Sequence, residues 1–364
     1  MAPPDRDPIR LLIVDDSAFN RRNIADVFAA HPEVQVVGKA GDGEEALKLA
    51  TLLKPDVITC DLEMPRMDGF TFLRILMAKQ PTPVIVVSSY AQRENVFKAL
   101  ELGALDFVTK PERQIAPDAS EVHAEILQKV LMVRSLRSTY VPTSLIRRPT
   151  SIAPPSDSTP SAPGSIPPAP ASVPYRLPKR LVAIASSTGG PSALLQIFGK
   201  VPKTSASAFV VAQHMPDKFT RTFAERLDKR GPVRTSEAQD GDAVAQLTGY
   251  VCPGRRCMEV VFEAGELRVV VGAPLTDDRY VPSADRLFAS VARSAGPRSI
   301  GVVLTGMGDD GLRGAKAIRD AGGTILAESQ ETAVVFGMPG AVVRAGLANE
   351  VLPLPQIADW LAAL

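Results

Sequence analysis

The chain has 364 residues, which is long enough for two domains of ordinary size. Its 41 Lys and Arg residues nearly balance its 40 Asp and Glu residues, so its charge gives no reason to expect a nucleic-acid partner. Three cysteines are too few for a disulfide framework and indicate reduced thiols. No apolar stretch approaches the length of a membrane span, and the first residues lack a signal-peptide pattern, so we expect a cytoplasmic protein without membrane insertion.

A segment rich in proline and serine divides the chain. Residues 142–178 contain 11 prolines and 7 serines among 37 residues. Such a segment cannot bury enough apolar surface to offset the entropy of ordering it. The sequence therefore predicts a flexible linker over residues 140–178, between an N-terminal domain over residues 1–139 and a C-terminal domain over residues 179–364.

The N-terminal region alternates short β-branched runs with segments of helical period. Strands are expected at residues 10–14, 34–37, 57–60, 84–87 and 106–109, and helices at residues 18–30, 44–53, 69–79, 93–102 and 120–137. This alternation predicts a doubly wound α/β domain with a parallel sheet. Ligand chemistry in such a fold lies at the carboxyl ends of the strands, near the point where the strand order reverses.

Acidic residues follow two of these strands. Asp15 and Asp16 come after the run LLIV, and Asp61 comes after VITC. Neighbouring carboxylates repel one another unless a divalent cation holds them, and oxygen-rich sites suit Mg²⁺. Ser88 and Lys110 follow the fourth and fifth strands and are suited to binding the oxygens of a phosphoryl group on Asp61. For a single residue a plain helix N-cap explains the pattern about as well, but five residues in matching positions favour a phospho-accepting site.

These residues resemble the receiver domain of two-component response regulators, which has a flavodoxin-like fold. The resemblance rests on the motifs DLEMPRMDGF and TKP and extends over residues 8–138. It implies that Asp61 is phosphorylated, with a histidine kinase as the phosphodonor. Phe107 falls where this family keeps an aromatic switch residue, although packing on the sheet edge explains it equally well from the sequence.

The C-terminal region also alternates strand-like runs with helical segments, but different turn residues separate them. Strands are expected at residues 181–185, 208–212, 299–304 and 324–327, and helices are expected to begin at Pro191, Asp217, Ala284 and Gly311. Residues 239–271 alternate as strands around the turns PGRR and EAGE, which is typical of an antiparallel edge. The sequence therefore predicts an α/β domain with a mixed, mostly parallel sheet.

Two chemically active residues again follow strand-like runs. Ser187 lies in the glycine turn of ASSTGGPSALL, where a helix start offers backbone N–H groups to an anion. His214, the only histidine after the linker, follows AFVVA and suits the role of a general base. Alone, such a turn is more often structural and such a histidine more often buried and hydrogen-bonded, so the case depends on finding both.

A third strand and turn, GVVLTGMGDDGLRGA, supplies a carboxylate. Asp310 is suited to orienting His214, while Asp309 fits a helix N-cap, and spacing alone does not distinguish the two aspartates. The same segment contains the pattern G-x-G-x-x-G, which is also found in dinucleotide sites. Two aspartates inside that loop would repel a pyrophosphate, which disfavours a nucleotide site.

These segments resemble the chemotaxis-specific family of protein-glutamate methylesterases and glutamine deamidases. The matching motifs are SSTGG, QHMPDKFTRTFAERL, GMGDDG and VFGMPG, which cover most of residues 180–352. By this resemblance Ser187 is the nucleophile, His214 is the base and Asp310 is the third member of the triad. The Met307 backbone N–H is our candidate oxyanion donor, and the family implies no cofactor in this domain.

The resemblance implies a substrate and a mode of regulation. The substrates would be glutamate γ-methyl esters of methyl-accepting chemoreceptors, with methanol released, and receptor glutamines would be deamidated by the same chemistry. The two-domain arrangement predicts that the unphosphorylated receiver blocks the catalytic face and that phosphorylation shifts this equilibrium. We expect a monomer, because no heptad or extended apolar patch argues for an obligate assembly.

Two positions depart from the family pattern. Ala185-Ser186 stands where Gly-Ala is usual, and Cys257 stands where a histidine is common. The first departure leaves open an alternative in which the second domain only binds partners in a phosphorylation-dependent way. A DNA-binding response regulator is disfavoured, because no basic recognition helix or aromatic and basic patch follows the linker.

Overall fold

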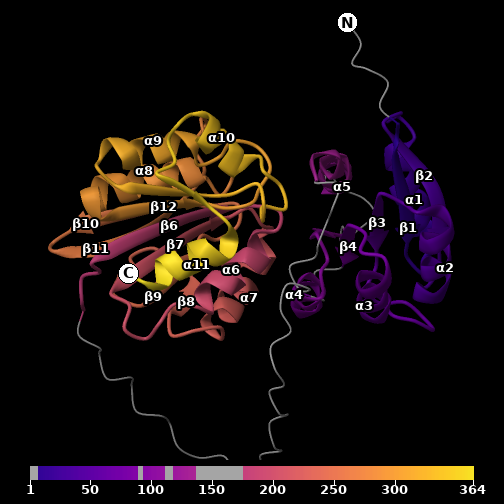
Figure 1. Cartoon of the computed structure of the whole chain (residues 1–364), viewed down its shortest axis with the longest axis horizontal. Coiled ribbons are helices and arrows are strands. Elements are labelled where there is room, and N and C mark those ends of the chain that lie inside the picture. The colour runs from indigo at the N-terminus through magenta and orange to yellow at the C-terminus, as the bar shows by residue number, and fades with distance from the viewer. Residues whose placement is uncertain (1–6, 89–92, 111–117, 137–174) are drawn as a thin grey trace, which may run out of the picture.

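Two parallel sheets organise the chain, one on each side of the segment rich in proline and serine (Figure 1). The computed structural model describes residues 7–88, 93–110, 118–136 and 175–364. Most of the linker expected at residues 140–178 therefore lies outside the described residues, and the exact domain boundaries stay predictions.

The first sheet has five parallel strands in the order β2-β1-β3-β4-β5. Its elements are β1 (Ile9–Val14), α1 (Ala18–Phe28), β2 (Val34–Ala40), α2 (Gly43–Leu53), β3 (Val57–Cys60), α3 (Gly69–Lys79), β4 (Val84–Ser88), α4 (Arg93–Glu101), β5 (Asp106–Thr109) and α5 (Asp118–Met132). Apolar residues of α1 and α5 pack on one face of the sheet, and those of α2, α3 and α4 pack on the other. The predicted doubly wound α/β fold is confirmed here, and the strand order reverses between β1 and β3.

The second sheet has seven strands, all parallel, in the order β14-β13-β12-β6-β7-β9-β8. Its strands are β6 (Arg180–Ser186), β7 (Ser207–Gln213), β8 (Arg234–Glu237), β9 (Thr248–Val251), β12 (Ser299–Val303), β13 (Thr324–Glu328) and β14 (Glu350–Leu352). Its helices are α6 (Gly190–Phe198), α7 (Asp217–Asp228), α8 (Ala284–Ala295), α9 (Leu312–Asp320), α10 (Met338–Arg344) and α11 (Leu354–Ala362). Helices α6, α7 and α11 cover one face and α8, α9 and α10 the other, as Figure 1 shows, and the strand order reverses between β6 and β12.

The antiparallel strands expected near residues 239–271 form a hairpin of their own instead of an edge of the main sheet. Strands β10 (Cys257–Glu263) and β11 (Glu266–Gly272) pair only with each other as a sheet and pack one face against α8. Met258, Val260, Leu267 and Val269 are buried on that face, which accounts for the alternating pattern. Strand β9, from the same stretch of sequence, joins the main sheet in parallel.

Several short elements carry too little pattern to be predicted. Strands β8 and β14 have four and three residues, and β8 reads RTSE without an apolar run. Helix α10 has seven residues, fewer than a periodic pattern needs to stand out. Among the described helices, none is both long enough and apolar enough to span a bilayer.

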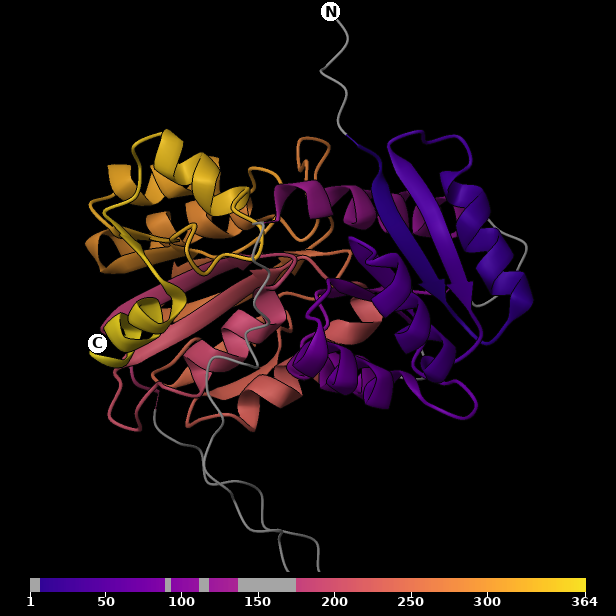
Figure 2. The same ribbon diagram turned by 45° about the vertical axis from the view of Figure 1, so that its right-hand side comes forward.

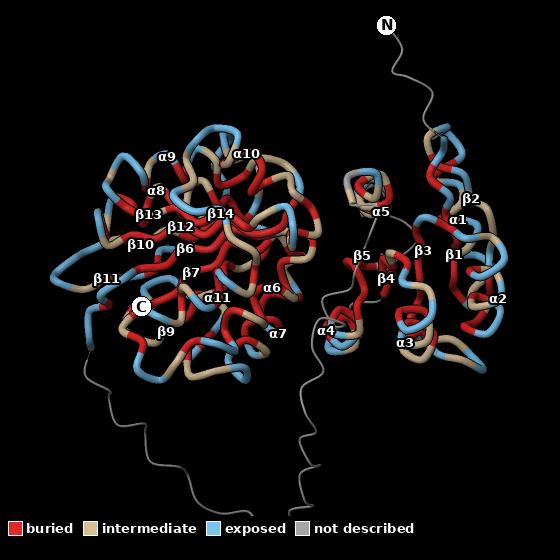
Figure 3. Tube along the Cα trace, in the orientation of Figure 1, coloured by how far each residue is buried: buried red, intermediate tan, exposed pale blue. Residues whose placement is uncertain are grey.

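The two domains lie against each other (Figure 2), and aromatic side chains form part of the contact. Phe97 of α4 stacks on Phe223 of α7 at 5.6 Å between ring centroids, and Phe107 of β5 lies 4.7 Å from Phe219 of α7. All four rings are buried. In the rest of the molecule the buried residues lie mainly on the strands of the two sheets and on the helix faces that cover them (Figure 3). At the rim of this contact, Arg226 of α7 lies 2.8 Å from Glu101 of α4. This interface brings the receiver against the carboxyl-end edge of the second sheet.

Candidate functional site

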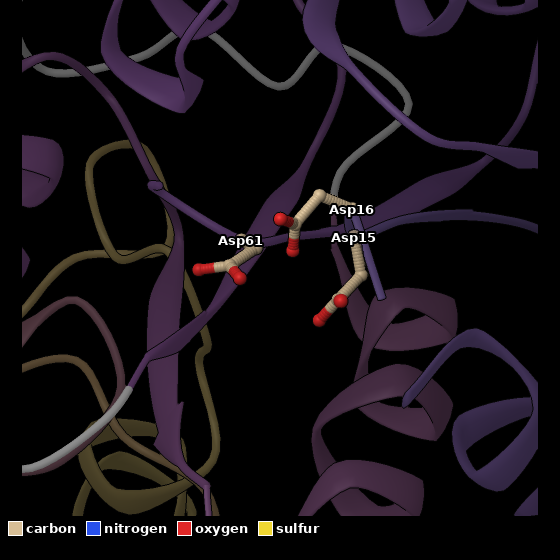
Figure 4. Close-up of side chains that lie close together, drawn as sticks. All are labelled: Asp15, Asp16 and Asp61. Carbon is tan, nitrogen blue, oxygen red and sulfur yellow. The ribbon is translucent and has the colours of Figure 1, made fainter. Parts of the chain in front are cut away.

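Three carboxylates gather where the strand order of the first sheet reverses (Figure 4). Val14 and Cys60 are paired at the ends of β1 and β3, so the loops that follow them lie side by side. Asp15, Asp16 and Asp61 each offer a carboxylate oxygen within 4.8 Å of the others. Asp15 and Asp61 are buried, while Asp16 is exposed, so the cluster opens to solvent on one side.

Lys110 places a positive charge against two carboxylates of this cluster. Its Nζ lies 2.8 Å from Asp15 Oδ2 and 2.5 Å from Asp61 Oδ2. Burial, reinforced by the Asp15 charge and opposed by Lys110, raises the pKa of Asp61. Burial acts to lower the pKa of Lys110, but attraction to Asp61 and Asp15 outweighs it, so that pKa is raised as well. Both raised pKa values show that these groups hold protons more strongly than they do in water, as expected where buried negative charge is not fully compensated. A divalent cation on these oxygen ligands would supply the missing positive charge.

The carboxylates of this cluster do not serve as simple helix caps. Ser17 caps α1, and Asp68 caps α3. Asp15 instead accepts a hydrogen bond from the Ser17 N–H at 2.9 Å, and Asp61 accepts one from the Leu62 N–H at 2.7 Å. The alternative of N-caps therefore does not describe these residues.

The remaining predicted residues of the receiver lie on β4 and β5, the two strands on the far side of β3 from β1. Ser88 ends β4 and is buried, and its carbonyl accepts the N–H of Lys110 at 2.8 Å across the strand pair. Phe107 points away from solvent into the domain interface, where it contacts Phe219. Its ring therefore packs on the second domain as well as on the sheet edge.

The two adjacent serines in the turn after β6 differ in burial and in hydrogen bonding. Ser186 is fully buried, and its hydroxyl donates to Gln213 Oε1 at 2.6 Å. Ser187 is partly exposed, and its hydroxyl makes no hydrogen bond to the described part of the chain. Gly190 makes this packing possible, since a Cβ there would lie 2.2 Å from Gln213 Oε1. Ser186 thus has a structural partner, whereas the hydroxyl of Ser187 remains accessible from solvent.

Gln213 fixes the serine and the histidine in register. Its Nε2 donates to the carbonyl of Ser187 at 3.0 Å and to that of His214 at 2.9 Å, while the His214 N–H donates to the carbonyl of Ser186 at 3.0 Å. Sequence reasoning missed this role of Gln213, although the residue lies inside the QHMP motif. The useful signal would have been the burial of an amide side chain beside His214, and the sequence alone does not show which side chains are buried.

His214 is held by one carboxylate. Its Nε2 lies 2.8 Å from Asp310 Oδ2, which leaves Nδ1 as the ring nitrogen free to take a proton from a serine. Asp310 is itself buried and accepts the N–H groups of Ala284 and Asp285 at 2.8 and 3.0 Å. These two donors open helix α8, so the carboxylate lies at the positive end of that helix.

The two aspartates of GMGDDG have different partners. Asp310 contacts His214, whereas Asp309 accepts hydrogen bonds from the Tyr280 hydroxyl at 2.9 Å and from Arg279 at 3.1 Å. Helix α9 has Gly311 at its N-cap, so Asp309 does not cap it. The G-x-G-x-x-G pattern here shapes the turn that carries Asp310, and a buried carboxylate occupies the place where a phosphate would need donors.

Met307 lies in the same turn as the two aspartates. Its side chain is exposed, and among the described residues its backbone N–H has no acceptor. A free N–H beside the cavity is what an oxyanion donor requires. Cys257, the second departure, is buried with its Sγ 3.4 Å from Asp278 Oδ2 and does not line the cavity described next.

A cavity of about 650 Å³ lies between the two domains. Its walls include Ser187, His214, Met307, Phe107 and Lys129. Thr188, next to Ser187, donates from Oγ1 to Asp106 Oδ2 of the receiver at 2.5 Å. Asp106 also forms an ion pair with the half-buried Lys129, whose Nζ donates to the carbonyl of Phe107 at 2.6 Å. The receiver thus forms one wall of the cavity that contains the serine and the histidine.

Comparisons with known proteins identify both domains. The response regulator receiver domain model matches residues 11–116, and the CheB methylesterase model matches residues 182–361. A protein-glutamate methylesterase/protein-glutamine glutaminase 1 of Myxococcus xanthus is 44% identical over 356 residues, which are 98% of this chain and 97% of the relative. A protein-glutamate methylesterase/protein-glutamine glutaminase 3 of Geobacter sulfurreducens is 45% identical over 357 residues, 96% of this chain and 95% of the relative.

Among solved structures, the catalytic domain of Thermotoga maritima CheB methylesterase is 37% identical and covers 50% of this chain and 97% of its own, with a TM-score of 0.49. The matches with the two relatives extend over both domains of this chain. The chain therefore belongs to the CheB methylesterase family and is an esterase with a response-regulator receiver domain at its N-terminal side.

Proposed function

We propose that this chain hydrolyses glutamate γ-methyl esters on methyl-accepting chemoreceptors and deamidates receptor glutamines, under the control of phosphorylation at Asp61. One observation carries the proposal: His214, bound to the buried Asp310, lines the same cavity as Ser187 where the strand order of the second sheet reverses. The relatives that match the whole chain are named for both activities.

The chemistry follows from the partners of each side chain. The Ser187 Oγ attacks the ester carbonyl carbon while Nδ1 of His214 takes the hydroxyl proton. Asp310 keeps the imidazole oriented through Nε2 and stabilises its protonated form. The tetrahedral intermediate collapses, the imidazolium returns its proton to the departing methoxide, and methanol leaves. Water, deprotonated by His214, then attacks the acyl-enzyme, and the proton returns to Ser187, so that glutamate is released.

The Met307 backbone N–H is the donor that we assign to the developing oxyanion. It lies in the turn after β12, beside the cavity, and its side chain is exposed, which leaves the backbone accessible. Loss of one such donor costs about 10²–10³ in rate in other acyl-transfer enzymes. For a glutamine substrate the same residues act with ammonia as the leaving group.

The receiver carries the regulatory phosphorylation in this proposal. Asp61 accepts the phosphoryl group from a histidine kinase, and Lys110 and Ser88 bind its oxygens. Asp15, Asp16 and Asp61 would hold Mg²⁺, which supplies positive charge to neutralise the incoming phosphoryl group. The excess of carboxylates over lysine in this cluster supports the assignment.

Regulation in the proposal works by occlusion. The receiver forms one wall of the cavity through Phe107 and through Asp106, which accepts a hydrogen bond from Thr188, so it would restrict the access of a large substrate to Ser187. Phe107 occupies the position of the family's switch residue, three residues before Lys110, and therefore connects the phosphorylation site with the interface. Phosphorylation would favour a receiver conformation that binds the second domain less tightly.

The setting of the reaction completes the proposal. The partners are chemoreceptors as substrate and a chemotaxis histidine kinase as phosphodonor, without a nucleic acid, and the protein acts as a monomer in the cytoplasm. All three cysteines are unpaired and buried, as expected for a reducing compartment. Since Ser186 has a structural partner, no observation favours the alternative of a second domain that only binds.

The decisive experiment measures methanol release from methylated receptor membranes. Wild type and Ser187→Ala are compared, each with and without a small phosphodonor and Mg²⁺. We expect release that requires Ser187 and rises with the phosphodonor. Absence of release from a folded wild-type protein under every condition would overturn the assigned substrate.

Occlusion is tested separately by removing residues 1–178. The shortened protein should release methanol faster than the full chain does without phosphodonor, because the wall formed by Phe107 and Asp106 is gone. An unchanged or lower rate from a folded product contradicts occlusion while leaving the esterase assignment untouched.

A further inference from the structure

Tyr280 lies against the catalytic histidine, on the loop between β11 and α8. Its ring and the imidazole of His214 are stacked, with centroids 5.5 Å apart and planes inclined by 10°. Both residues line the interdomain cavity. The contact matters because, among the described residues, the imidazole of His214 has one hydrogen-bond partner, Asp310, at one ring nitrogen. A single hydrogen bond lets the imidazole rotate about that bond, and a ring stacked on its face restricts the rotation.

Tyr280 is itself anchored to the turn that contains the catalytic aspartate. Its hydroxyl donates to Asp309 Oδ1 at 2.9 Å, and Arg279 donates to Asp309 Oδ2 at 3.1 Å. The guanidinium of Arg279 also lies 5.6 Å from the centre of the Tyr280 ring. Asp309 therefore fixes the ring at its polar end while Arg279 covers it.

The protonation states of this pair suit a fixed anchor. Partial burial and the hydrogen bond to Asp309 raise the pKa of Tyr280, so its hydroxyl stays a donor. Burial acts against Asp309, but its hydrogen bonds from Tyr280 and Arg279 prevail and lower its pKa, so it stays an acceptor.

The ring also packs against the segment that carries Met307. Gly308 has a φ of +90°, and a Cβ at this position would lie 2.5 Å from the Tyr280 hydroxyl oxygen. The close approach of Tyr280 thus requires glycine in the turn, next to the N–H that we assign to the oxyanion. One side chain contacts both the base and the oxyanion turn.

We infer that Tyr280, anchored by Asp309, is a positioning residue that holds the His214 imidazole and the turn at residues 306–310 in one arrangement. This inference rests on the proposed function, in which His214 takes the proton of Ser187. It gives the first aspartate of GMGDDG a role distinct from that of Asp310. Correct placement of reacting groups is worth about 10²-fold for a displacement near 1 Å, so we expect an effect on kcat rather than on substrate binding.

The test compares Tyr280→Leu, which removes the ring, with Tyr280→Phe, which keeps it. Methanol release is measured on methylated receptor membranes with phosphodonor and Mg²⁺ present, and thermal unfolding checks the fold. Tyr280→Leu should lower kcat by about 10- to 100-fold with KM within about twofold. Tyr280→Phe should recover most of kcat, because the stacked face is retained. Asp309→Asn, which keeps an oxygen acceptor, should resemble Tyr280→Phe, and Asp309→Ala should fall between Tyr280→Phe and Tyr280→Leu.

Tyr250→Phe is the matched control. It removes a tyrosine hydroxyl that makes a hydrogen bond of the same length, 2.9 Å to the Ala243 carbonyl, at a site that does not line the cavity. Its kcat should equal that of the wild type. A Tyr280→Leu variant with wild-type kcat, or a Tyr280→Phe variant as impaired as Tyr280→Leu, would overturn the inference.

A second readout separates this inference from the proposed substrate. A fluorophosphonate probe labels an activated serine without needing a methyl ester. The rate of Ser187 labelling should fall in Tyr280→Leu and be restored in Tyr280→Phe. If the wild type labels at Ser187 but releases no methanol, the proposed substrate fails while the positioning role is still tested by these two labelling rates.

Discussion

The two domains place carboxylates at the same point of a parallel sheet but satisfy them differently. In the receiver, three carboxylates, Asp15, Asp16 and Asp61, lie close together, and Lys110 forms ion pairs with two of them, Asp15 and Asp61. In the catalytic domain, one buried carboxylate, Asp310, is surrounded by backbone N–H groups and the imidazole of His214. Both clusters follow strands at which the strand order reverses.

The difference teaches how one sheet edge serves two kinds of chemistry. A cluster with excess negative charge has to bind a cation from solution, and it can therefore exchange both that cation and a phosphoryl group. A carboxylate whose charge is compensated by the chain stays fixed and orients another side chain. The receiver edge is therefore suited to switching and the catalytic edge to preorganisation, and each prediction below tests one side of this contrast.

The largest loss of activity is expected from a change at Asp310, the carboxylate whose charge is compensated by hydrogen-bond donors of the chain. Asp310→Asn removes the charge that stabilises protonated His214 and offers an NH₂ group where Nε2 and the Ala284 N–H now donate. The equivalent change in a serine-protease triad lowers kcat about 10⁴-fold, and we expect a loss of that order here. Methanol release measures it, with and without phosphodonor, and the loss should be the same in both.

The same experiment needs a check on folding, because Asp310 also accepts N–H groups of α8. Circular dichroism and thermal unfolding should show a folded domain. Should a folded Asp310→Asn variant retain more than a tenth of the wild-type kcat, Asp310 would not be the orienting residue.

The second prediction concerns Glu328, a buried carboxyl that the chain compensates poorly. Among the described residues it accepts the Thr305 N–H at 2.8 Å and the Thr332 hydroxyl at 2.9 Å, and burial raises its pKa from 4.5 to about 7. A raised carboxyl pKa means that its contribution to stability is present below pH 4.5 and is lost as the pH rises through about 7. From pH 5 to pH 8 the wild type should lose roughly 2 kcal/mol or more of unfolding free energy through this group.

Glu328→Gln should remove most of this pH dependence, since the amide keeps an acceptor for Thr305 without a charge. The free energy of unfolding in urea is followed at pH 5 and pH 8 by the fluorescence of Trp360, the single tryptophan, which lies in the second domain. Equal pH dependence in the two proteins would show that Glu328 is ionised at no cost.

The third prediction concerns the undercompensated cluster. Asp61→Asn should abolish stimulation by phosphodonor while basal methanol release stays unchanged, because Asp61 does not line the catalytic cavity. For a receiver shift of about 1.4 kcal/mol, the stimulation that is lost would be roughly tenfold. EDTA should reproduce the loss in the wild type. Asp26→Asn, at an exposed position on α1, is the control and should keep the stimulation. Stimulation that survives in Asp61→Asn would place the phosphorylation on another residue.

Much of this contrast is readable from the sequence. The strands and helices of the receiver lie within a few residues of the predicted ones, because each β-branched run is followed by a clear helical period. The strand-end positions of Asp61, Ser187 and Asp310 follow from the same pattern, and a parallel sheet then places such residues at one edge.

What the sequence could not provide depends on contacts between distant segments. The hairpin β10–β11 has the alternation of any half-buried strand, and nothing local says that it leaves the main sheet to pack on α8. The roles of Gln213 and Tyr280 come from stacking and hydrogen bonds that join separate loops. The distinction between Asp309 and Asp310 also needed partners from the loop before α8 and its first turn, 25 to 30 residues away in sequence.

The smallest expected effect lies at the rim that joins the two domains. Glu101 on α4 and Arg226 on α7 form an ion pair at 2.8 Å, and Glu101 is exposed enough for solvent to screen much of the attraction. Pairs of this kind contribute about 0.2–1 kcal/mol, so Glu101→Gln should raise the open fraction of the receiver, and basal methanol release, about twofold. Activity at saturating phosphodonor should stay constant, because the open state itself is unchanged. Lys316→Gln breaks a comparable exposed pair with Asp320 inside the catalytic domain and should leave both rates as they are. If Glu101→Gln alters the stimulated rate as strongly as the basal rate, the ion pair acts on catalysis rather than on closure, and the two edges would not be coupled through this interface.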